Sequence, residues 1–362
     1  MMPFSFKEFS QTLQEQVRHY PLMKPQDAVK LCYQRAFGAA HFCGGADIAL
    51  EALREECLGL SPDPSAQLFE NIGGIDGACR LYLPGVLAAD ISLPLLSRAF
   101  ALDAALTPPD KEWFKDALNG LLIFSKNNQF PFSYSEMETF LNHYKKQGYP
   151  TIRHSEQYHN TYTPHYRVFA GPVARLLPLI IAIDKQLKTL PDTERLSIAL
   201  DGFSSSGKTT AAKYLAQIFE ADVVHMDDFF LPSVLRTPER YAEPGGNVHY
   251  ERFSVEVAPY LCKRKAFSYQ VFECSRMDFG PLAQIGDGSV LFVEGAYALN
   301  PRCKATYGLT AFFDISIEEQ EKRIRTRNGD ELWHRFQDLW IPLEHAYAEA
   351  FNIRFKTDFH IV

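Results

Sequence analysis

Hydrophobic and polar positions follow two different patterns, one in each half of the chain. In the first half, apolar residues recur at three- and four-residue spacing, which is the period of an amphipathic helix. The segments with this pattern lie at 28–37, 48–60, 93–106, 111–124, 135–147 and roughly 172–188. Stretches rich in Gly, Pro and Asp separate them at 61–65, 71–77 and 107–110. The first half is therefore predicted to be mainly α-helical.

After residue 195, short apolar runs alternate with helical patterns. Strands are predicted at 196–200, 221–226, 290–295, 310–315 and 359–362, and helices at 208–219, 318–327 and 333–351. This alternation predicts an α/β fold with a mostly parallel sheet covered by helices on both faces. A polar, Pro-containing stretch at 188–195 marks the boundary. We therefore expect a mainly helical domain at 1–190 and an α/β domain at 191–362.

Composition narrows the class of protein. The chain has 362 residues, 46% of them hydrophobic, and a net charge of −7, which argues against a nucleic-acid partner held by a basic surface. Its seven cysteines include no CxxC pair, so we expect neither a zinc site nor a disulfide framework, and a cytoplasmic location. No signal peptide or membrane-spanning run is recognised, so no membrane partner is expected. A homo-oligomer remains open.

The segment DGFSSSGKTT, at 201–210, contains the pattern GxxxxGK followed by Thr. This pattern follows a predicted strand and opens a predicted helix, as a phosphate-binding loop requires. Gly202 and Gly207 permit backbone conformations closed to other residues, and the loop N–H groups and helix N-terminus attract an anion. Lys208 supplies a positive charge and Thr209 a hydroxyl for Mg²⁺. The expected nucleotide contacts are Gly202, Ser204, Ser205, Ser206, Gly207, Lys208, Thr209 and Thr210.

Two acids follow the second predicted strand, in HMDDFF at 225–230. Ligands of such sheets lie at the carboxyl ends of the strands, so Asp227 should lie beside the loop. Its carboxylate could accept a proton from a hydroxyl or help to hold Mg²⁺. Asp228 is equally compatible with a solvated turn or a helix cap. No NKxD-type segment follows the loop, which argues against a GTPase.

The ordered motifs GFSSSGKTT, HMDDFF and VEGAYAL, followed by an Arg-rich helix, resemble a known family. They are similar to the uridine kinase, phosphoribulokinase and pantothenate kinase group of P-loop kinases, and most similar to its uridine kinase-like bacterial members. The resemblance covers about 195–362. It implies a nucleoside-monophosphate-kinase-like α/β fold, ATP with Mg²⁺, and transfer of the γ-phosphoryl group to a hydroxyl of a small molecule such as uridine.

The resemblance also implies roles for individual residues. Asp227 matches the family's general base, with a possible second role at Mg²⁺, and Glu294 matches the acid that supports Mg²⁺ together with Thr209. Arg323 and Arg327 match lid arginines that act with Lys208 on the transferred phosphate. Independently, their spacing of four places both arginines on one helix face.

The segment after HMDDFF supplies the candidates for binding the acceptor. Asn247, His249, Tyr250 and Arg252 carry hydrogen-bonding and stacking groups. An ordered loop with internally satisfied polar groups is an equally good interpretation of them. The resemblance predicts an Asp where His249 stands, and this departure weakens the assignment of a ribose-containing acceptor.

Other candidate residues have no motif with a mechanism. His154, His159 and His165 lie in the segment 152–169, together with tyrosines and Arg167. Their spacing suits a metal site poorly, so aromatic–polar packing or an anion-binding pocket is favoured. His41, in GAAHFCGG, is expected to be structural. Glu344 is expected to take part in helix packing around Trp340 and Tyr347.

Three functions are compatible with these features. The favoured one is an ATP- and Mg²⁺-dependent kinase that phosphorylates a small-molecule hydroxyl. The second is a regulator in which ATP binding controls a partner-binding helical half, and the third is hydrolysis of ATP by water. The presence of Lys208, Asp227, Glu294, Arg323 and Arg327 together argues against a pure regulator, which has no need of a base.

Overall fold

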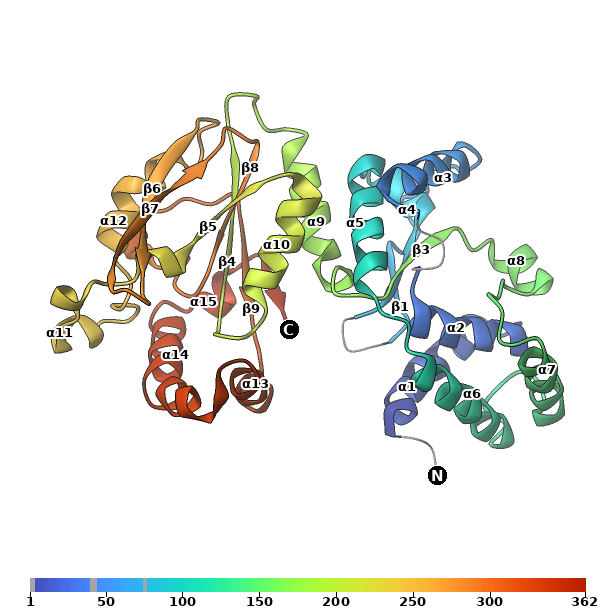
Figure 1. Cartoon of the computed structure of the whole chain (residues 1–362). Helices are drawn as coiled ribbons and strands as arrows, with labels where there is room; N and C mark the ends of the chain where they lie inside the picture. Colours follow the sequence, from blue (N-terminus) through green and yellow to red (C-terminus); the bar gives the residue numbers. More distant parts are fainter. Residues whose placement is uncertain (1–3, 40–43, 74–76) are drawn as a thin grey trace. The chain divides into compact units, whose positions relative to one another are not determined.

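The computed structural model describes residues 4–39, 44–73 and 77–362. The chain divides into two compact units, Met1–Leu177 and Pro178–Val362 (Figure 1). This division falls at the start of helix α9 (Leu177–Leu187), whereas the sequence places a boundary after this helix. No helix in the described ranges combines the length and apolar character needed to cross a bilayer.

The first unit is mainly helical, as predicted. Its helices are α1 (Phe4–His19), α2 (Pro25–Phe37), α3 (Ala46–Leu58), α4 (Leu83–Ala88), α5 (Leu93–Leu106), α6 (Lys111–Lys126), α7 (Tyr134–Lys146) and α8 (Glu156–Tyr162). Several start where a side chain caps free backbone N–H groups. Ser133 and Glu136, for example, form a reciprocal capping box at α7. The Asp110 carboxylate accepts the N–H of Trp113 at α6.

A small antiparallel sheet, which the sequence did not predict, lies in the same unit. Its strands β1 (Phe69–Asn71), β2 (Cys79–Tyr82) and β3 (Tyr166–Phe169) pair in the order β1-β2-β3. Each strand has only three or four residues, too few to show a two-residue period in the sequence. The sheet matters because it carries Arg80 and Tyr166 into the interior of the unit.

The second unit contains a five-stranded sheet in which every pair of neighbouring strands is parallel. The strands are β4 (Leu196–Gly202), β5 (Asp222–His225), β8 (Val290–Glu294), β9 (Leu309–Phe313) and β10 (Phe359–Ile361), and their order is β10-β9-β4-β8-β5. All five predicted strands are present, so the predicted parallel sheet is confirmed. A β6 (Phe267–Glu273) and β7 (Asp278–Ile285) hairpin forms a separate antiparallel pair that was not predicted.

Helices cover both faces of the parallel sheet. Helix α10 (Lys208–Phe219) is the next element after β4, and its Phe219 lies against Phe292 of β8. Leu291 and Val293, on either side of Phe292 in β8, belong instead to the hydrophobic core on the opposite face of the sheet. That core includes residues of α12 (Tyr250–Glu256), α14 (Ile341–Ala350) and α15 (Ile353–Lys356), and the chain also forms α11 (Pro238–Tyr241) and α13 (Ile317–Arg335). The α/β prediction therefore holds for the whole unit.

Candidate functional site

A tight loop joins β4 to α10 at the carboxyl end of the central strand. Gly202 has φ +142°, and a Cβ there would lie 2.1 Å from the carbonyl oxygen of Phe313 on β9. Gly207 has φ +99° and is the N-cap of α10. Ser205 also has a positive φ, of +61°. These conformations turn the backbone sharply into the helix, so its first free N–H groups and the helix dipole form an anion-attracting site.

The polar groups of this loop are only partly satisfied by the protein. The Lys208 ammonium is buried and donates to the carbonyl oxygen of Phe203 at 2.7 Å. The hydroxyl oxygens of Ser205 and Ser206 are buried without a hydrogen-bond partner among the described residues. Buried polar atoms without partners are uncommon because they lose their bonds to water. A phosphate group would give both hydroxyls a partner, so the loop fits the anion that its sequence predicts.

Glu294 connects the loop to the neighbouring strand. It ends β8, where it pairs in register with Leu200 of β4 on one side and His225 of β5 on the other. One carboxylate oxygen accepts the hydroxyl of Thr209 at 3.0 Å, and the other lies 2.6 Å from Nδ1 of His225. This hydrogen bond raises the pKa of His225, which favours the imidazolium. Oxygen ligands of this kind suit Mg²⁺, so Thr209 and Glu294 are compatible with the predicted metal site.

The two acids after β5 have different surroundings. Both lie in a short 3₁₀ helix, Met226–Phe229. The pKa of Asp227 is raised, first by partial loss of hydration and then by Glu294, while Lys208 opposes the shift. Asp227 is therefore within electrostatic range of both residues and remains exposed to solvent. Asp228 accepts a hydrogen bond from the Tyr269 hydroxyl at 2.8 Å, which gives it a structural role.

Of the two predicted lid arginines, Arg323 contacts the loop. Its guanidinium donates to the carbonyl oxygen of Ser205 at 3.2 Å. Gln320, one turn earlier on α13, donates to both the carbonyl and the hydroxyl of Ser204 at 3.0 Å. Arg327 is exposed and donates instead to its neighbour Asn328 at 2.8 Å. The spacing that places both arginines on one face does not bring both to the loop.

Glu344, for which the sequence analysis expected only helix packing, also contacts the phosphate-binding loop. Its carboxylate accepts the backbone N–H of Ser204 at 2.8 Å and is almost fully buried. Burial raises its pKa to about 7, against the opposing effect of Lys208. The acid shares the buried face of α14 with Tyr347, whose hydroxyl donates to Asp201 at 2.6 Å. The sequence offered one signal of this burial: Glu344 lies on the same face of its helix as apolar residues.

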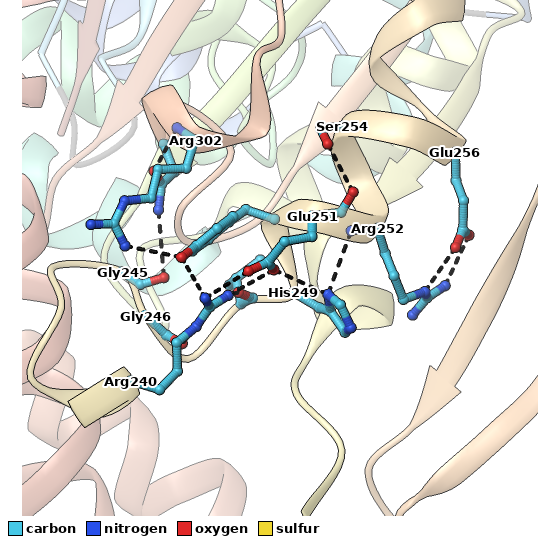
Figure 2. A network of polar contacts seen from close by, with 12 residues as sticks. Arg240, Gly245, Gly246, His249, Glu251, Arg252, Ser254, Glu256 and Arg302 are labelled. Atoms are coloured by element: carbon cyan, nitrogen blue, oxygen red, sulfur yellow. Dashed lines mark hydrogen bonds and ion pairs between the residues drawn. The ribbon is translucent and has the colours of Figure 1, made fainter. Parts of the chain in front are cut away.

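The predicted acceptor residues are largely engaged with other protein groups, as Figure 2 shows for His249 and Arg252. Nδ1 of His249 caps α12 by accepting the N–H of Arg252 and also lies 3.2 Å from Glu251. Arg252 forms two hydrogen bonds with Glu256, at 2.8 and 2.9 Å. The interpretation as an ordered, internally satisfied loop therefore gains support for His249. Arg252 is satisfied only in part, because its buried Nη1 has no hydrogen-bond partner among the described residues.

The two remaining acceptor candidates differ from each other. The Tyr250 hydroxyl donates to Glu243 at 3.0 Å and accepts from Arg302 at 3.1 Å and from Arg240. Asn247 is buried, and its side-chain oxygen has no partner in the part of the chain that the structure describes. Asn247 thus shares with Arg252 a buried polar atom that has no partner among the described residues.

The three histidines of segment 152–169 do not converge. His154 lies 2.9 Å from Asp27, His165 lies 3.4 Å from Glu56, and His159 is on the exposed side of α8. Across 4–39, 44–73 and 77–362 there is no group of three or more His, Cys, Asp or Glu side chains that could hold a metal. Arg167 pairs with Glu56 at 2.5 Å. His41 lies outside the described residues.

Comparisons with known proteins place few constraints on the chain. No protein-family model matches it, and no curated protein matches it. Among solved structures, a "putative fructose transport system kinase" from Silicibacter sp. TM1040 is similar over 47% of this chain and 90% of its own, with 23% identity and a TM-score of 0.40. A "possible uridine kinase" from Bacillus stearothermophilus is similar over 51% of this chain and 100% of its own, with 18% identity and a TM-score of 0.38. At these scores neither similarity bears on function, which must be inferred from the residues themselves.

Proposed function

We propose that the second unit is an ATP- and Mg²⁺-dependent kinase that transfers the γ-phosphoryl group to a hydroxyl of a small molecule. The observation that carries this proposal is the meeting of four groups at the carboxyl ends of β4, β5 and β8. Lys208 and Thr209 come from the loop, Glu294 accepts the Thr209 hydroxyl, and Asp227 is within electrostatic range of Lys208 and Glu294. A protein that only binds ATP would require the phosphate-binding loop but not the exposed carboxylate of Asp227.

Each residue has a physical task in this proposal. Lys208 and Arg323 would neutralise charge on the phosphate oxygens, which is the main requirement of phosphoryl transfer. Mg²⁺, if held by Thr209 and Glu294, would supply further positive charge. Asp227 would accept the proton of the acceptor hydroxyl, and a positioned base typically contributes a factor of about 10²–10⁴. Its exposure leaves its carboxylate accessible to an incoming alcohol.

The acceptor is defined less sharply than the nucleotide. A nucleoside such as uridine remains the first compound to test, because it follows from the sequence resemblance. The internal partners of His249, Tyr250 and Arg252 reduce the support for a ribose site at these residues. Oδ1 of Asn247 and Nη1 of Arg252, which have no partner among the described residues, are the remaining candidate groups to bind an acceptor.

The test is ADP release from ATP and Mg²⁺ across a panel of hydroxyl-bearing metabolites led by uridine and cytidine. Asp227→Asn removes the proposed base, and Asp228→Asn is the matched control because Asp228 is bonded to Tyr269. Release that one compound stimulates, and that only Asp227→Asn abolishes, is the expected result. Release independent of every alcohol would indicate hydrolysis. ATP binding with no turnover would favour the regulatory function.

A further inference from the structure

The first unit contains a polar cavity that is separate from the loop site. Its volume is about 470 Å³, within the range of small-molecule sites. Residues from α2, from the segment before α8, from α8 itself and from β3 line it: Lys30, Arg153, His154, Glu156, His159, Asn160, Pro164 and Tyr166. Side chains from two separate parts of the chain, α2 and the segment 153–166, therefore converge on one space.

Two cationic side chains line the cavity, and neither forms an ion pair with a carboxylate of the described residues. Lys30 donates only a long hydrogen bond, 3.3 Å, to the carbonyl oxygen of Ile152. Among the described residues, no carboxylate forms an ion pair with Lys30 or Arg153. Glu156 is the single acid of the lining and is exposed. Two unpaired cations at one cavity attract an oxyanion, for which they supply charge-assisted hydrogen bonds.

A series of side-chain hydrogen bonds fixes one wall of the cavity. Burial lowers the pKa of His154 to about 4, so its ring is neutral at pH 7. Its Nδ1–H donates to Asp27 at 2.9 Å, and its Nε2 accepts the hydroxyl of Tyr166 at 2.5 Å. Gln34 donates to the same hydroxyl at 2.8 Å. His154 is also stacked on Tyr158, with ring centroids 3.9 Å apart.

Asp27 lies at one end of this series of hydrogen bonds. It accepts hydrogen bonds from the backbone N–H and the hydroxyl of Ser155, at 2.8 and 2.7 Å, in addition to that from His154. These bonds hold its pKa below the ordinary value although burial acts in the opposite direction. With Asp27 ionised and fully bonded, the wall is fixed before any ligand arrives. A preformed wall lowers the entropic cost of binding.

We propose that this cavity binds a small molecule through a phosphate or carboxylate group, with Lys30 and Arg153 as the cations that hold the oxyanion. His159 and Asn160, on α8 at the opening, supply further donors for the rest of the molecule. The Tyr166 hydroxyl donates to His154 and accepts from Gln34, so it belongs to the fixed wall of the cavity and is not counted among the groups that bind the ligand. The site is independent of the kinase proposal, since none of its residues belongs to the second unit.

The state of Lys30 agrees with this assignment. Burial, together with repulsion from Arg80, lowers its pKa to about 8, and Asp27 partly offsets the shift. The ammonium is therefore still mostly protonated at pH 7, but no carboxylate of the described residues forms an ion pair with it. An oxyanion in the cavity supplies a counter-ion, and affinity should fall as the pH rises through 8. Neutral or cationic molecules gain nothing from these two side chains.

The proposal is tested by calorimetric titration of the full chain with inorganic phosphate, glycerol 3-phosphate and succinate at pH 7. The measurements use the Lys208→Ala background, because the loop of the second unit would itself bind phosphate. We expect one binding site for at least one of the three probes. Phosphate and glycerol 3-phosphate binding without succinate binding identifies a phosphate ligand, and the reverse identifies a carboxylate.

Substitutions then locate the site. Arg153→Gln and Lys30→Gln should each weaken binding about tenfold or more, because each removes a charge-assisted hydrogen bond. Arg54→Gln and Lys146→Gln, at exposed positions outside the cavity, should leave it unchanged. Arg153 is exposed, so its variant is expected to fold even if Lys30→Gln does not. Absence of binding by all three probes, or unchanged binding by Arg153→Gln, overturns the proposal.

Discussion

The carboxylate of Glu344 accepts the backbone N–H of Ser204 at 2.8 Å, across 140 residues of sequence. A buried acid thus stabilises the phosphate-binding loop in the absence of a ligand. It does so at a cost, because burial disfavours the ionised carboxylate and raises its pKa to about 7. The two effects make the stability of the second unit depend on pH through one side chain.

The first prediction concerns this pH dependence. Between the ordinary pKa of a glutamate and about 7, the unfolded chain loses the Glu344 proton while the folded protein keeps it. The contribution of Glu344 to the free energy of unfolding is therefore largest at low pH, and it falls as the pH rises, by about 3 kcal/mol at most. Glu344→Gln retains an acceptor for the Ser204 N–H but does not titrate. Its free energy of unfolding should fall less between pH 5 and pH 8.

Urea unfolding at both pH values measures the difference. Trp333 and Trp340 lie in the second unit, so in a Trp113→Phe background tryptophan fluorescence reports on that unit alone. Asp201 and Asp227, whose pKa values are also raised, titrate in both proteins, so Glu344→Gln should reduce the pH dependence without abolishing it. Equal changes in the two proteins would show that Glu344 is not the titrating group.

The second prediction concerns Gly202. An added Cβ would collide with the Phe313 carbonyl on the neighbouring strand, and φ is +142°. Gly202→Ala should destabilise the second unit by about 3 kcal/mol or more, because steric overlap adds to backbone strain. Gly288→Ala is the control, since its added Cβ meets only an atom at 3.6 Å. Its effect should be within about 0.5 kcal/mol. Urea unfolding compares both, and similar values for the two would contradict the steric argument.

The parallel sheet could be predicted because its strands are continuous apolar runs ending in recognisable motifs. Val290–Glu294 is buried at every position, which makes its strand signal unambiguous. Strand β7 is exposed at most positions and was missed, since its residues carry no two-residue apolar period. The contact of Glu344 with Ser204 could not be predicted either. It depends on how α14 packs on the loop, and sequence spacing carries no information about packing between distant segments.

Helix α13 shows the same limit within one element. Spacing correctly places Arg323 and Arg327 on a shared face, but only tertiary structure decides which one reaches the loop. The predicted acceptor residues were chosen for their chemistry, and the structure supplies internal partners for three of them: His249, Tyr250 and Arg252. The sequence shows that a loop side chain has hydrogen-bonding groups. It does not show whether other protein groups already bond to them in the fold.

The third prediction separates these two arginines. Arg323→Gln should lower kcat of the proposed kinase about 10- to 100-fold, because it removes the guanidinium that reaches the Ser205 carbonyl. Arg327→Gln should have a smaller effect, since Arg327 is bonded to Asn328 at the surface. Steady-state turnover with the identified acceptor measures both. An equal or larger loss in Arg327→Gln would indicate that α13 moves when substrates bind.

The fourth prediction concerns the interior of the first unit, where Arg80 is almost fully buried. Its guanidinium donates to Glu70 at 2.9 Å and to the side-chain oxygens of Gln16 and Gln34 at 3.0 and 2.8 Å. Arg80→Met leaves the Glu70 carboxylate buried without its cation. We expect a loss of about 3–5 kcal/mol, the usual consequence of breaking a buried ion pair from one side. Fluorescence of Trp113 during urea unfolding, with Trp333 and Trp340 replaced by Phe, reports this unit.

A double substitution distinguishes the unpaired charge from simple loss of packing. Adding Glu70→Gln to Arg80→Met removes the charge and keeps one side-chain oxygen as an acceptor. The hydroxyls of Tyr20 and Tyr82 bond different oxygens of Glu70, each at 2.7 Å, so one hydroxyl loses its acceptor, which destabilises less than an unpaired buried charge. The double variant should therefore be more stable than Arg80→Met alone. Arg54→Met, at an exposed position of α3, should have almost no effect. If the double variant is no more stable than the single one, packing of the Arg80 side chain, and not its charge, stabilises the interior of this unit.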